Sequence, residues 1–391
     1  MIKDTITNFD RMKVLVAGDY YPNERATARI ERNDTAFVDS SIRDLIKSSD
    51  FSIVNFECPI VEGNDSLPIL KSGPNLKTGR YAATFLKQLG FSMSTLANNH
   101  TLDYGGEALL YTKKCLESEG ILTVGVGNSL NDAEKTAFVN VDGKKLAIIN
   151  CCEHEYSIAS DRSPGANPLN PIKQFYRIKE AKEQADYVLM IIHGGNEHFQ
   201  LPSPRMQEVY RFFIEQGADA VVNHHQHCPC GYEVWNGKPI FYGIGNFCFD
   251  NLNGDNNKMW NYGYLVVLDF SDVAQFSIHP YCQFGDKPTI EALKDKDKEQ
   301  FIQRIESLNI VVASPDDVKV HYDDAMKKMA QGLKFLFTPW QGRLSIKLYE
   351  RGLLPSLMNK KKTIYYHNCL QCESQKDKIQ VLLDSIYESL S

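Results

Sequence analysis

From Lys13 to about Pro280, short apolar runs alternate with amphipathic stretches. The runs have the length and the β-branched content of buried strands, and the stretches between them repeat apolar residues at helical intervals. The strand-like runs are Lys13–Ala17, Phe51–Phe56, Ser92–Leu96, Leu122–Val126, Thr136–Val141, Lys145–Asn150, Tyr187–Ile192, Ala220–Asn223, Pro239–Gly243, Gly263–Phe270 and Gln275–Tyr281. The helical stretches are Ala36–Ser48, Arg80–Leu89, Gly106–Ser118, Ile172–Gln184 and Arg205–Glu215. This alternation predicts an α/β layered domain.

Two tight-turn dipeptides, Asp142–Gly143 and Asn236–Gly237, each separate two apolar segments. Such dipeptides favour hairpins, so we expect a sheet with antiparallel pieces. After about residue 285 the composition shifts toward charged residues and Leu, with helical spacing over Ile290–Leu308, Asp316–Phe335, Leu344–Leu353 and Gln375–Leu390. We therefore expect one domain over residues 1–285 and a helical extension over residues 286–391 that packs on it.

Composition and charge exclude several classes of protein. Of the 391 residues, 43% are apolar and 24% are charged, which is typical of globular chains. The formal net charge is −6, and no stripe of Lys and Arg interleaved with aromatic residues is present, so nucleic acid is not an expected partner. Met1–Phe9 is polar and the longest apolar runs are strand-sized. We expect a cytoplasmic chain without a signal peptide or transmembrane segment, with membrane association through partners left open.

The ten cysteines are expected to be reduced thiols. Cys369 and Cys372 form a C-x-x-C pair, but no second pair lies at zinc-finger distance. We interpret this pair as a chance spacing in a cysteine-rich chain.

Polar residues of metal-ligand type follow five of the apolar runs. Strand ends are where α/β folds gather their functional sites, and six of the ten histidines lie in or beside these segments. The segments are Gly18–Asp19, Asn55–Glu57, Asn98–Asp103, His193–Glu197 and His224–His227. Imidazole and carboxylate suit zinc, manganese or iron, and an Asn carbonyl adds an oxygen ligand. Two metal ions bridged by one carboxylate would activate water for hydrolysis.

The same segments resemble the CapA family of poly-γ-glutamate capsule-biosynthesis proteins. The matching strings are Val16–Asp19, Asn55–Ile60, Ala97–Gly105, His193–Glu197, His225–His227 and Tyr242–Phe247, in order and at matching spacing. The resemblance implies a four-layer αββα sandwich like that of calcineurin-like metallophosphoesterases. It also implies a role in the synthesis of capsule or another exopolymer, poly-γ-glutamate or polysaccharide.

The resemblance assigns roles by position. It implies Asp19 and His227 as ligands of a first metal, Glu57 as a bridging carboxylate, and Asn99, His193 and His225 as ligands of a second metal. His100 resembles the general acid of the phosphoesterases, and Asp103 is a candidate to orient its ring. The phosphoesterase motif Asp-x-His is here Asp19–Tyr20–Tyr21, so one first-metal histidine is missing. We therefore expect one or two divalent metal ions per chain.

Other residues are predicted to contact substrate. Arg25 lies in a stretch after Asp19 that we interpret as a long loop, and Lys77 lies in the loop between the second and third strands. Both cations favour an anionic polymer or a phosphorylated small molecule. Glu197 and Asn246 are further candidates beside the site, whereas His198 and His224 are interpreted as structural.

Two functions stay open. The first is a metal-dependent hydrolase or transferase that cleaves a phosphoester or an amide in capsule or exopolymer metabolism. The second is a non-catalytic protein that keeps a degenerate metal site and binds an anionic polymer or a capsule synthase complex. The retained histidines favour the first, and Tyr21 favours the second.

Overall fold

The computed structural model describes residues 12–63, 66–141, 143–251, 258–270, 275–330, 340, 342–356, 358–371 and 373–390. The described contacts divide the chain into two units, residues 1–319 and residues 320–391. The boundary lies later in the chain than residue 285, because the first long helix after the sheets belongs to the first unit.

Two large sheets form the centre of the first unit. One has the strand order β16-β15-β14-β1-β2-β3-β4, with β13 also paired to β1, and the other has the order β11-β12-β10-β9-β7-β6. The strands of the first sheet are β1 (Met12–Tyr20), β2 (Phe51–Phe56), β3 (Met93–Thr95), β4 (Leu122–Val124), β13 (Asn246–Cys248), β14 (Tyr262–Phe270), β15 (Gln275–Gln283) and β16 (Ile290–Ala292). Those of the second are β6 (Ala137–Val141), β7 (Lys144–Cys152), β9 (Tyr187–His193), β10 (Ala220–His224), β11 (Tyr232–Trp235) and β12 (Lys238–Phe241). A small third sheet pairs β5 (Val126–Gly127) with β8 (Gly165–Ala166).

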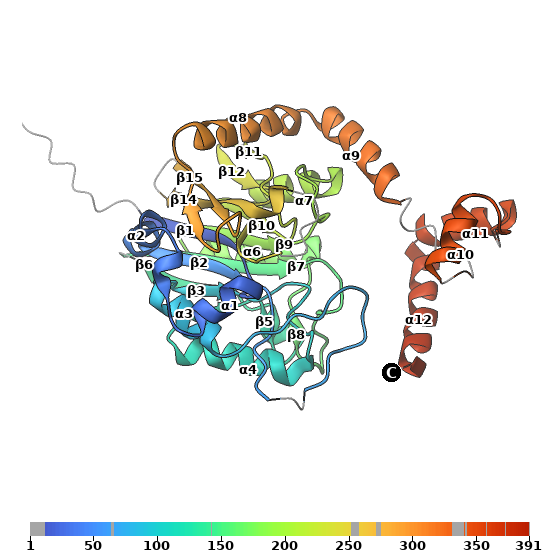
Figure 1. Ribbon diagram of the computed structural model, residues 1–391, viewed down its shortest axis with the longest axis horizontal. Helices are drawn as coiled ribbons and strands as arrows, with labels where there is room; N and C mark the ends of the chain where they lie inside the picture. The colour runs from blue at the N-terminus through green and yellow to red at the C-terminus, as the bar shows by residue number, and fades with distance from the viewer. Residues whose placement is uncertain are drawn as a thin grey trace, which may run out of the picture. The chain divides into compact units, whose positions relative to one another are not determined.

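Helices cover the outer faces of both sheets. Figure 1 shows α3 and α4 along one side of β1, β2 and β3. The helices of the first unit are α1 (Glu24–Ile30), α2 (Ser40–Ser48), α3 (Tyr81–Leu89), α4 (Gly105–Ser118), α5 (Leu130–Ala133), α6 (Pro171–Gln184), α7 (Pro204–Gln216) and α8 (Asp295–Val312), with short 3-10 turns η2 (Thr35–Phe37) and η3 (Lys258–Asn261).

Three apolar cores separate these layers, because successive side chains of a strand point to opposite faces of its sheet. In β1, Leu15 and Ala17 pack toward α2 and α3, whereas Val14 and Val16 face the second sheet. In β9, the alternate residues Val188 and Met190 pack toward α6 and α7. The αββα sandwich expected from the sequence is confirmed by this arrangement.

Two local expectations were wrong, and one further strand was not predicted. Glu24–Ile30 forms helix α1 and not a loop, with Ala26 and Ile30 as its buried residues. Ile290–Ala292 pairs with β15 as strand β16, so the following helix begins only at Asp295. Asn246–Cys248 forms strand β13, which pairs in parallel with β1.

The C-terminal region is helical, as expected. Its helices are α9 (Pro315–Met329), which spans the boundary between the units, α10 (Arg343–Glu350), α11 (Lys360–Gln371) and α12 (Glu373–Leu390). Helices α11 and α12 contact each other. Cys369 lies in α11, and Cys372, the other cysteine of the C-x-x-C spacing, lies outside the described residues. Packing of this region on the first unit stays a prediction.

Candidate metal centre

The six predicted metal ligands come together where the parallel strands of both sheets end. They lie at the end of β1 (Asp19), after β2 (Glu57), after β3 (Asn99), at the end of β9 (His193) and after β10 (His225 and His227). Strands β1, β2 and β3 run parallel, as do β9 and β10, so their carboxyl ends meet at one edge. This convergence follows from the topology of the two sheets.

Local backbone geometry positions Asp19, His225 and His227 in the cluster. A side chain at Gly18 would collide with the carbonyl oxygen of Gly245 at 1.9 Å, so only glycine lets β13 approach β1 here. After β10, His225 and His227 adopt positive φ angles of 94° and 54°. Such a conformation costs about 1 to 3 kcal/mol at a non-glycine residue and is concentrated at functional sites.

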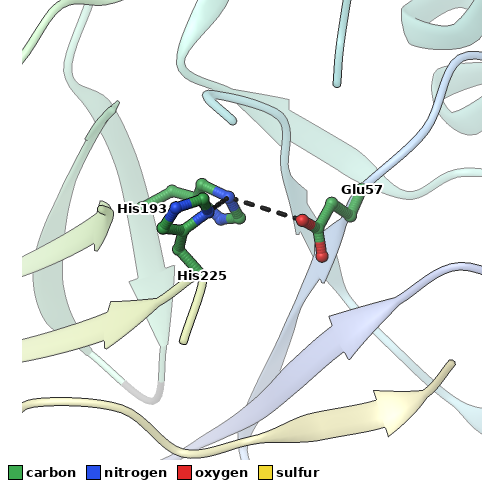
Figure 2. A group of neighbouring side chains, drawn as sticks. All are labelled: Glu57, His193 and His225. Carbon is green, nitrogen blue, oxygen red and sulfur yellow. Dashed lines mark hydrogen bonds and ion pairs between the residues drawn. The ribbon is translucent and has the colours of Figure 1, made fainter. Parts of the chain in front are cut away.

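One set of ligand atoms surrounds the Nε2 atom of His193. It lies 2.9 Å from Asn99 Oδ1, 3.1 Å from His225 Nδ1 and 3.5 Å from Glu57 Oε1. Figure 2 shows the two imidazole rings together, opposite the Glu57 carboxylate. The ligand atoms of Glu57, His193 and His225 all lie within 4.8 Å of one another. These are the residues expected to hold the second metal.

A second set of ligand atoms shares the same carboxylate. His227 Nε2 lies 3.7 Å from Glu57 Oε1, and His227 Nδ1 lies 3.6 Å from Asp19 Oδ2. Asp19, Glu57 and His227 again offer ligand atoms within 4.8 Å of one another. Glu57 is thus the one residue common to both sets, which is the geometry that a bridging carboxylate requires.

The electrostatics of the cluster fit a divalent cation. Both carboxylate oxygens of Glu57 are buried and have no hydrogen-bond partner among the described residues. Burial, and then the neighbouring Asp19 charge, raise the pKa of Glu57 well above its ordinary value. A bound cation would compensate this charge, since an uncompensated buried carboxylate is strongly unfavourable.

The histidines and Asp19 are held in the charge states that metal ligands need. Burial, followed by the charge of His225, lowers the pKa of His193 well below its ordinary value, and burial lowers the pKa of His227 to about 4. Burial alone would raise the pKa of Asp19, but His224, His193 and His227 outweigh it and the pKa is lowered. At neutral pH the cluster therefore offers the neutral imidazoles of His193 and His227 and an ionised Asp19.

Two asparagines orient the ligands. Asn55 Nδ2 donates to Asp19 Oδ1 over 2.7 Å, and Asn246 Oδ1 lies 2.8 Å from His227 Nδ1. With Nδ1 held in this way, Nε2 of His227 is directed at Glu57. Asn246 was predicted to contact substrate, but its side chain is fully buried and bonded to His227 and to backbone carbonyls. These bonds orient a ligand, and a contact of Asn246 with substrate stays a prediction.

His100 and Asp103 lie together beside Asn99, as predicted. Their side chains are buried, and His100 Nδ1 lies 2.7 Å from Asp103 Oδ2. The Lys71 ammonium contacts both residues. Lys71 begins the same loop as Lys77, which was expected to favour an anionic substrate, and nothing in the sequence placed Lys71 beside His100.

The predicted substrate-binding cations lie in other contacts. The Arg25 guanidinium pairs with buried Asp250 through two bonds of 2.8 Å and also donates to the carbonyls of Phe284 and Gly285. These bonds explain the position of Arg25, and its predicted contact with substrate stays a prediction. Lys77 is exposed, with its ammonium 5.1 Å from the centre of the Tyr104 ring. A substrate role for Lys77 stays a prediction.

Acidic residues lie at the edge of the cluster. Glu155, which the sequence analysis did not single out, has Oε1 3.7 Å from His225 Nε2 and accepts from Asn99 Nδ2 over 3.4 Å. The predicted Glu197 is half-exposed, 3.9 Å from His198 Nε2. Burial alone would raise the pKa of Glu197, but the charges of His227 and His225 outweigh it and the pKa is lowered. Its contact with substrate stays a prediction.

Aromatic rings surround Tyr21 and His227. The Tyr21 ring packs edge-on against Phe249 at 4.8 Å between centres, and Trp260 lies 4.7 Å from the His227 ring. Among the described residues, His224 is an additional neighbour of the cluster, because its Nδ1 lies 3.3 Å from Asp19 Oδ1. Tyr21 is thus part of an apolar contact and not of either ligand set.

The fold and site define an α/β protein with a buried cluster of carboxylates and histidines that fits divalent metal. The chain matches the family described as "Bacterial capsule synthesis protein PGA_cap" over residues 13–251, and it belongs to this family. The predicted resemblance is thereby confirmed.

Two curated relatives share the capsule-related naming. The chain is 29% identical over 249 residues to "Capsule biosynthesis protein CapA" of Bacillus anthracis, covering 62% of this chain and 60% of the relative. It is 32% identical over 212 residues to "PGA biosynthesis protein CapA" of Bacillus subtilis (strain 168), covering 54% of this chain and 56% of the relative. The matched region therefore spans less than two thirds of either relative.

Among solved structures, a phosphatase from Mycoplasma pneumoniae aligns with a TM-score of 0.45 and 13% identity, covering 76% of this chain and 99% of that one. This similarity is too distant to assign a function. No helix in the described part of the chain is both long and apolar enough to cross a membrane.

Proposed function

We propose that this protein is a metal-dependent hydrolase or transferase that acts in the synthesis of capsule or another exopolymer. The observation that carries the proposal is the position of Glu57. Its carboxylate is buried, has no hydrogen-bond partner among the described residues and belongs to both sets of ligand atoms. A protein that used the fold only as a scaffold would gain nothing from such a charge.

The ligand sets divide between two ions of manganese, iron or zinc. Asp19, Glu57 and His227 would hold the first, and Glu57, Asn99, His193 and His225 would hold the second. Bound there, divalent cations supply an activated water and neutralise charge on a phosphoryl or carbonyl oxygen. The first set has fewer ligands because Tyr21 stands where the phosphoesterase motif has a histidine, so we expect it to be the weaker one.

The protein side chains then handle the proton of the leaving group. His100 Nδ1 lies 2.7 Å from Asp103 Oδ2, which leaves Nε2 as the ring nitrogen available to the leaving group. We assign His100 the role of general acid, with Asp103 and Asn98 holding it in place. Asn98 Oδ1 accepts a hydrogen bond from the backbone N–H of His100 over 3.1 Å.

We propose an anionic polymer or a phosphorylated small molecule as the substrate, and a capsule synthase complex as the setting. Support comes from the family to which the chain belongs and from the relatives named for capsule and poly-γ-glutamate synthesis. The bond cleaved is a phosphoester or an amide.

A second candidate is a non-catalytic capsule protein that retains the metal site. The observation in its favour is the replacement of a ligand histidine by Tyr21, which completes an aromatic contact. In this case the ions would stabilise a binding surface without turnover.

The proposed activity is tested by comparing the turnover of wild type with that of a variant that lacks the histidines of the second ligand set. Protein loaded with manganese, iron or zinc is assayed on p-nitrophenyl phosphoesters and on a γ-glutamyl anilide, beside a His193→Ala/His225→Ala variant. Metal-dependent turnover that the variant lacks supports the enzyme. Equal background rates for both proteins on every substrate would leave the non-catalytic candidate in place.

A further inference from the structure

A short segment of the second unit concentrates positive charge in an otherwise acidic chain. Residues 343–362, which we call the basic segment, contain six basic residues and one acidic residue, so their formal net charge is +5. The whole chain has a net charge of −6, which leaves −11 for the residues outside the segment. The six basic residues are Arg343, Lys347, Arg351, Lys360, Lys361 and Lys362.

These cations form no ion pair with any side chain that the structure describes. In the first unit, by contrast, even a half-exposed cation such as Lys173 pairs with a carboxylate, that of Glu134. Residues 360–362 form the first turn of α11, the end at which the helix dipole is positive and repels cations. The described contacts of the basic segment therefore do not account for its charge.

Exposed leucines run alongside the cations. Residues four apart lie on one side of a helix, so Arg343, Lys347 and Arg351 form one stripe along α10. Leu344 and Leu348 form the neighbouring stripe. Leu344 is 73% exposed, and Leu353, just after the helix, is 67% exposed. The same surface thus offers positive charge and apolar area that a partner can cover.

Helix α10 is capped at both ends by its own segment. At its start, Ser345 Oγ accepts the Gly342 N–H over 3.0 Å. At its end, Gly352 has a φ angle of 72°, and the Leu353 N–H donates to the Leu348 carbonyl over 2.9 Å. This bond is typical of a Schellman cap, in which glycine takes the left-handed position. The two stripes are therefore presented on a preformed helix.

We propose that the basic segment binds the surface of a membrane that contains anionic lipids, with the leucines in the interfacial region and the cations against the lipid headgroups. Amphipathic helices that carry Lys or Arg beside Leu lie on membranes in this way without crossing them. The charge of the segment favours an anionic surface. The exposed leucines favour a membrane over a soluble polyanion, because a polyanion would need only the cations. The metal centre takes no part in this inference, so the two proposals stand or fall separately.

The test is flotation of the full-length protein with lipid vesicles. Vesicles of equal parts phosphatidylglycerol and phosphatidylcholine should capture the wild type, whereas vesicles of phosphatidylcholine alone should not. Arg343→Gln/Lys347→Gln/Arg351→Gln should weaken the binding about 100-fold, since each Lys or Arg near an anionic surface contributes roughly fivefold to the affinity.

Lys114→Gln/Lys296→Gln/Lys298→Gln is the matched control, because it removes the same charge from exposed positions of the first unit. It should bind anionic vesicles as the wild type does. Circular dichroism should show the same helix content in both triple variants. Equal weakening by the two triple variants would refute the assignment to the basic segment, since the net charge of the chain would then explain the binding.

Leu344→Ser/Leu353→Ser keeps every charge and should also lose most of the binding. If this variant bound vesicles like the wild type, and free poly-L-glutamate displaced the wild type from them, the cations alone would form a site for an acidic polymer and the membrane proposal would be refuted. A wild type that binds neither kind of vesicle, or both kinds equally, would overturn the proposal without any variant. If that wild type sedimented as a dimer and the leucine variant as a monomer, the partner would be a second copy of the chain.

Discussion

Replacing Glu57 by Gln is expected to change how the stability of the metal-free protein depends on pH. Both carboxylate oxygens of Glu57 are buried and have no hydrogen-bond partner in the described part of the chain. Burial and the Asp19 charge raise its pKa well above the ordinary value. The folded protein therefore keeps a proton on Glu57 at pH values where the unfolded chain has lost it.

The sign and size of the effect follow from proton linkage. A group whose pKa is raised by folding stabilises the protein fully below its unfolded pKa, and this stability is lost as the pH rises toward the folded pKa. The loss is about 1.4 kcal/mol per pH unit for one proton. His193 and His227 have lowered pKa values, so they destabilise the folded state only as the pH falls below about 6.5. Between about pH 7 and 8, Glu57 is therefore the one of these three groups that still makes the free energy of unfolding depend on pH.

The assay is urea unfolding of chelator-treated wild type and Glu57→Gln at several pH values from about 7 to 8, followed by circular dichroism. Groups common to both proteins cancel in the difference. The free energy of unfolding of Glu57→Gln, relative to wild type, should rise by up to about 1.4 kcal/mol per pH unit.

Glu134→Gln is the matched control. Burial alone would raise the pKa of Glu134, but Lys173 and Arg177 outweigh it and the pKa is lowered. This variant should differ from wild type by an amount that does not change between about pH 7 and 8. An equally flat difference for Glu57→Gln would refute the reasoning, because Glu57 would then be ionised in the metal-free protein.

Three further variants test separate parts of the site. His100→Asn should abolish turnover and leave the metal content unchanged in elemental analysis; a loss of metal would assign His100 to the ligands. Asn246→Ala should weaken the first metal site roughly 10- to 100-fold in calorimetric titration, because His227 loses its orienting bond; equal weakening at both sites would contradict this. Arg25→Met should lower the free energy of unfolding by about 3 kcal/mol, because buried Asp250 loses its partner. An increased KM with unchanged stability would instead support the predicted contact of Arg25 with substrate.

The sequence predicted the ligand clusters because each ligand directly follows an apolar run. Glu57 comes after β2, and His193 ends β9, so a strand assignment alone placed their side chains at a sheet edge. The layered fold was predictable for the same reason, since both faces of β1 and β9 are buried and read as continuous apolar runs.

The remaining contacts depend on residues far apart in the chain. Arg25 meets Asp250 across 225 positions, and its short helix α1 has only two buried residues to mark it in the sequence. Lys71 reaches His100 from the described segment 66–77, which lies outside the helices and strands, and Asn246 reaches His227 through the pairing of β13 with β1. Neither periodicity nor spacing in the sequence predicts which residues these side chains contact, so these contacts were found only in the structure.

The central claim is that Glu57 serves two metal sites, and elemental analysis of the purified protein after addition of manganese, iron or zinc tests it most directly. The wild type should hold metal at both sites, His227→Ala should lose metal from the first site, and His193→Ala/His225→Ala should lose metal from the second. Glu57→Gln should lose metal from both. A wild type that remains metal-free with every one of the three metals, or a Glu57→Gln variant that binds as much metal as wild type, would contradict the account.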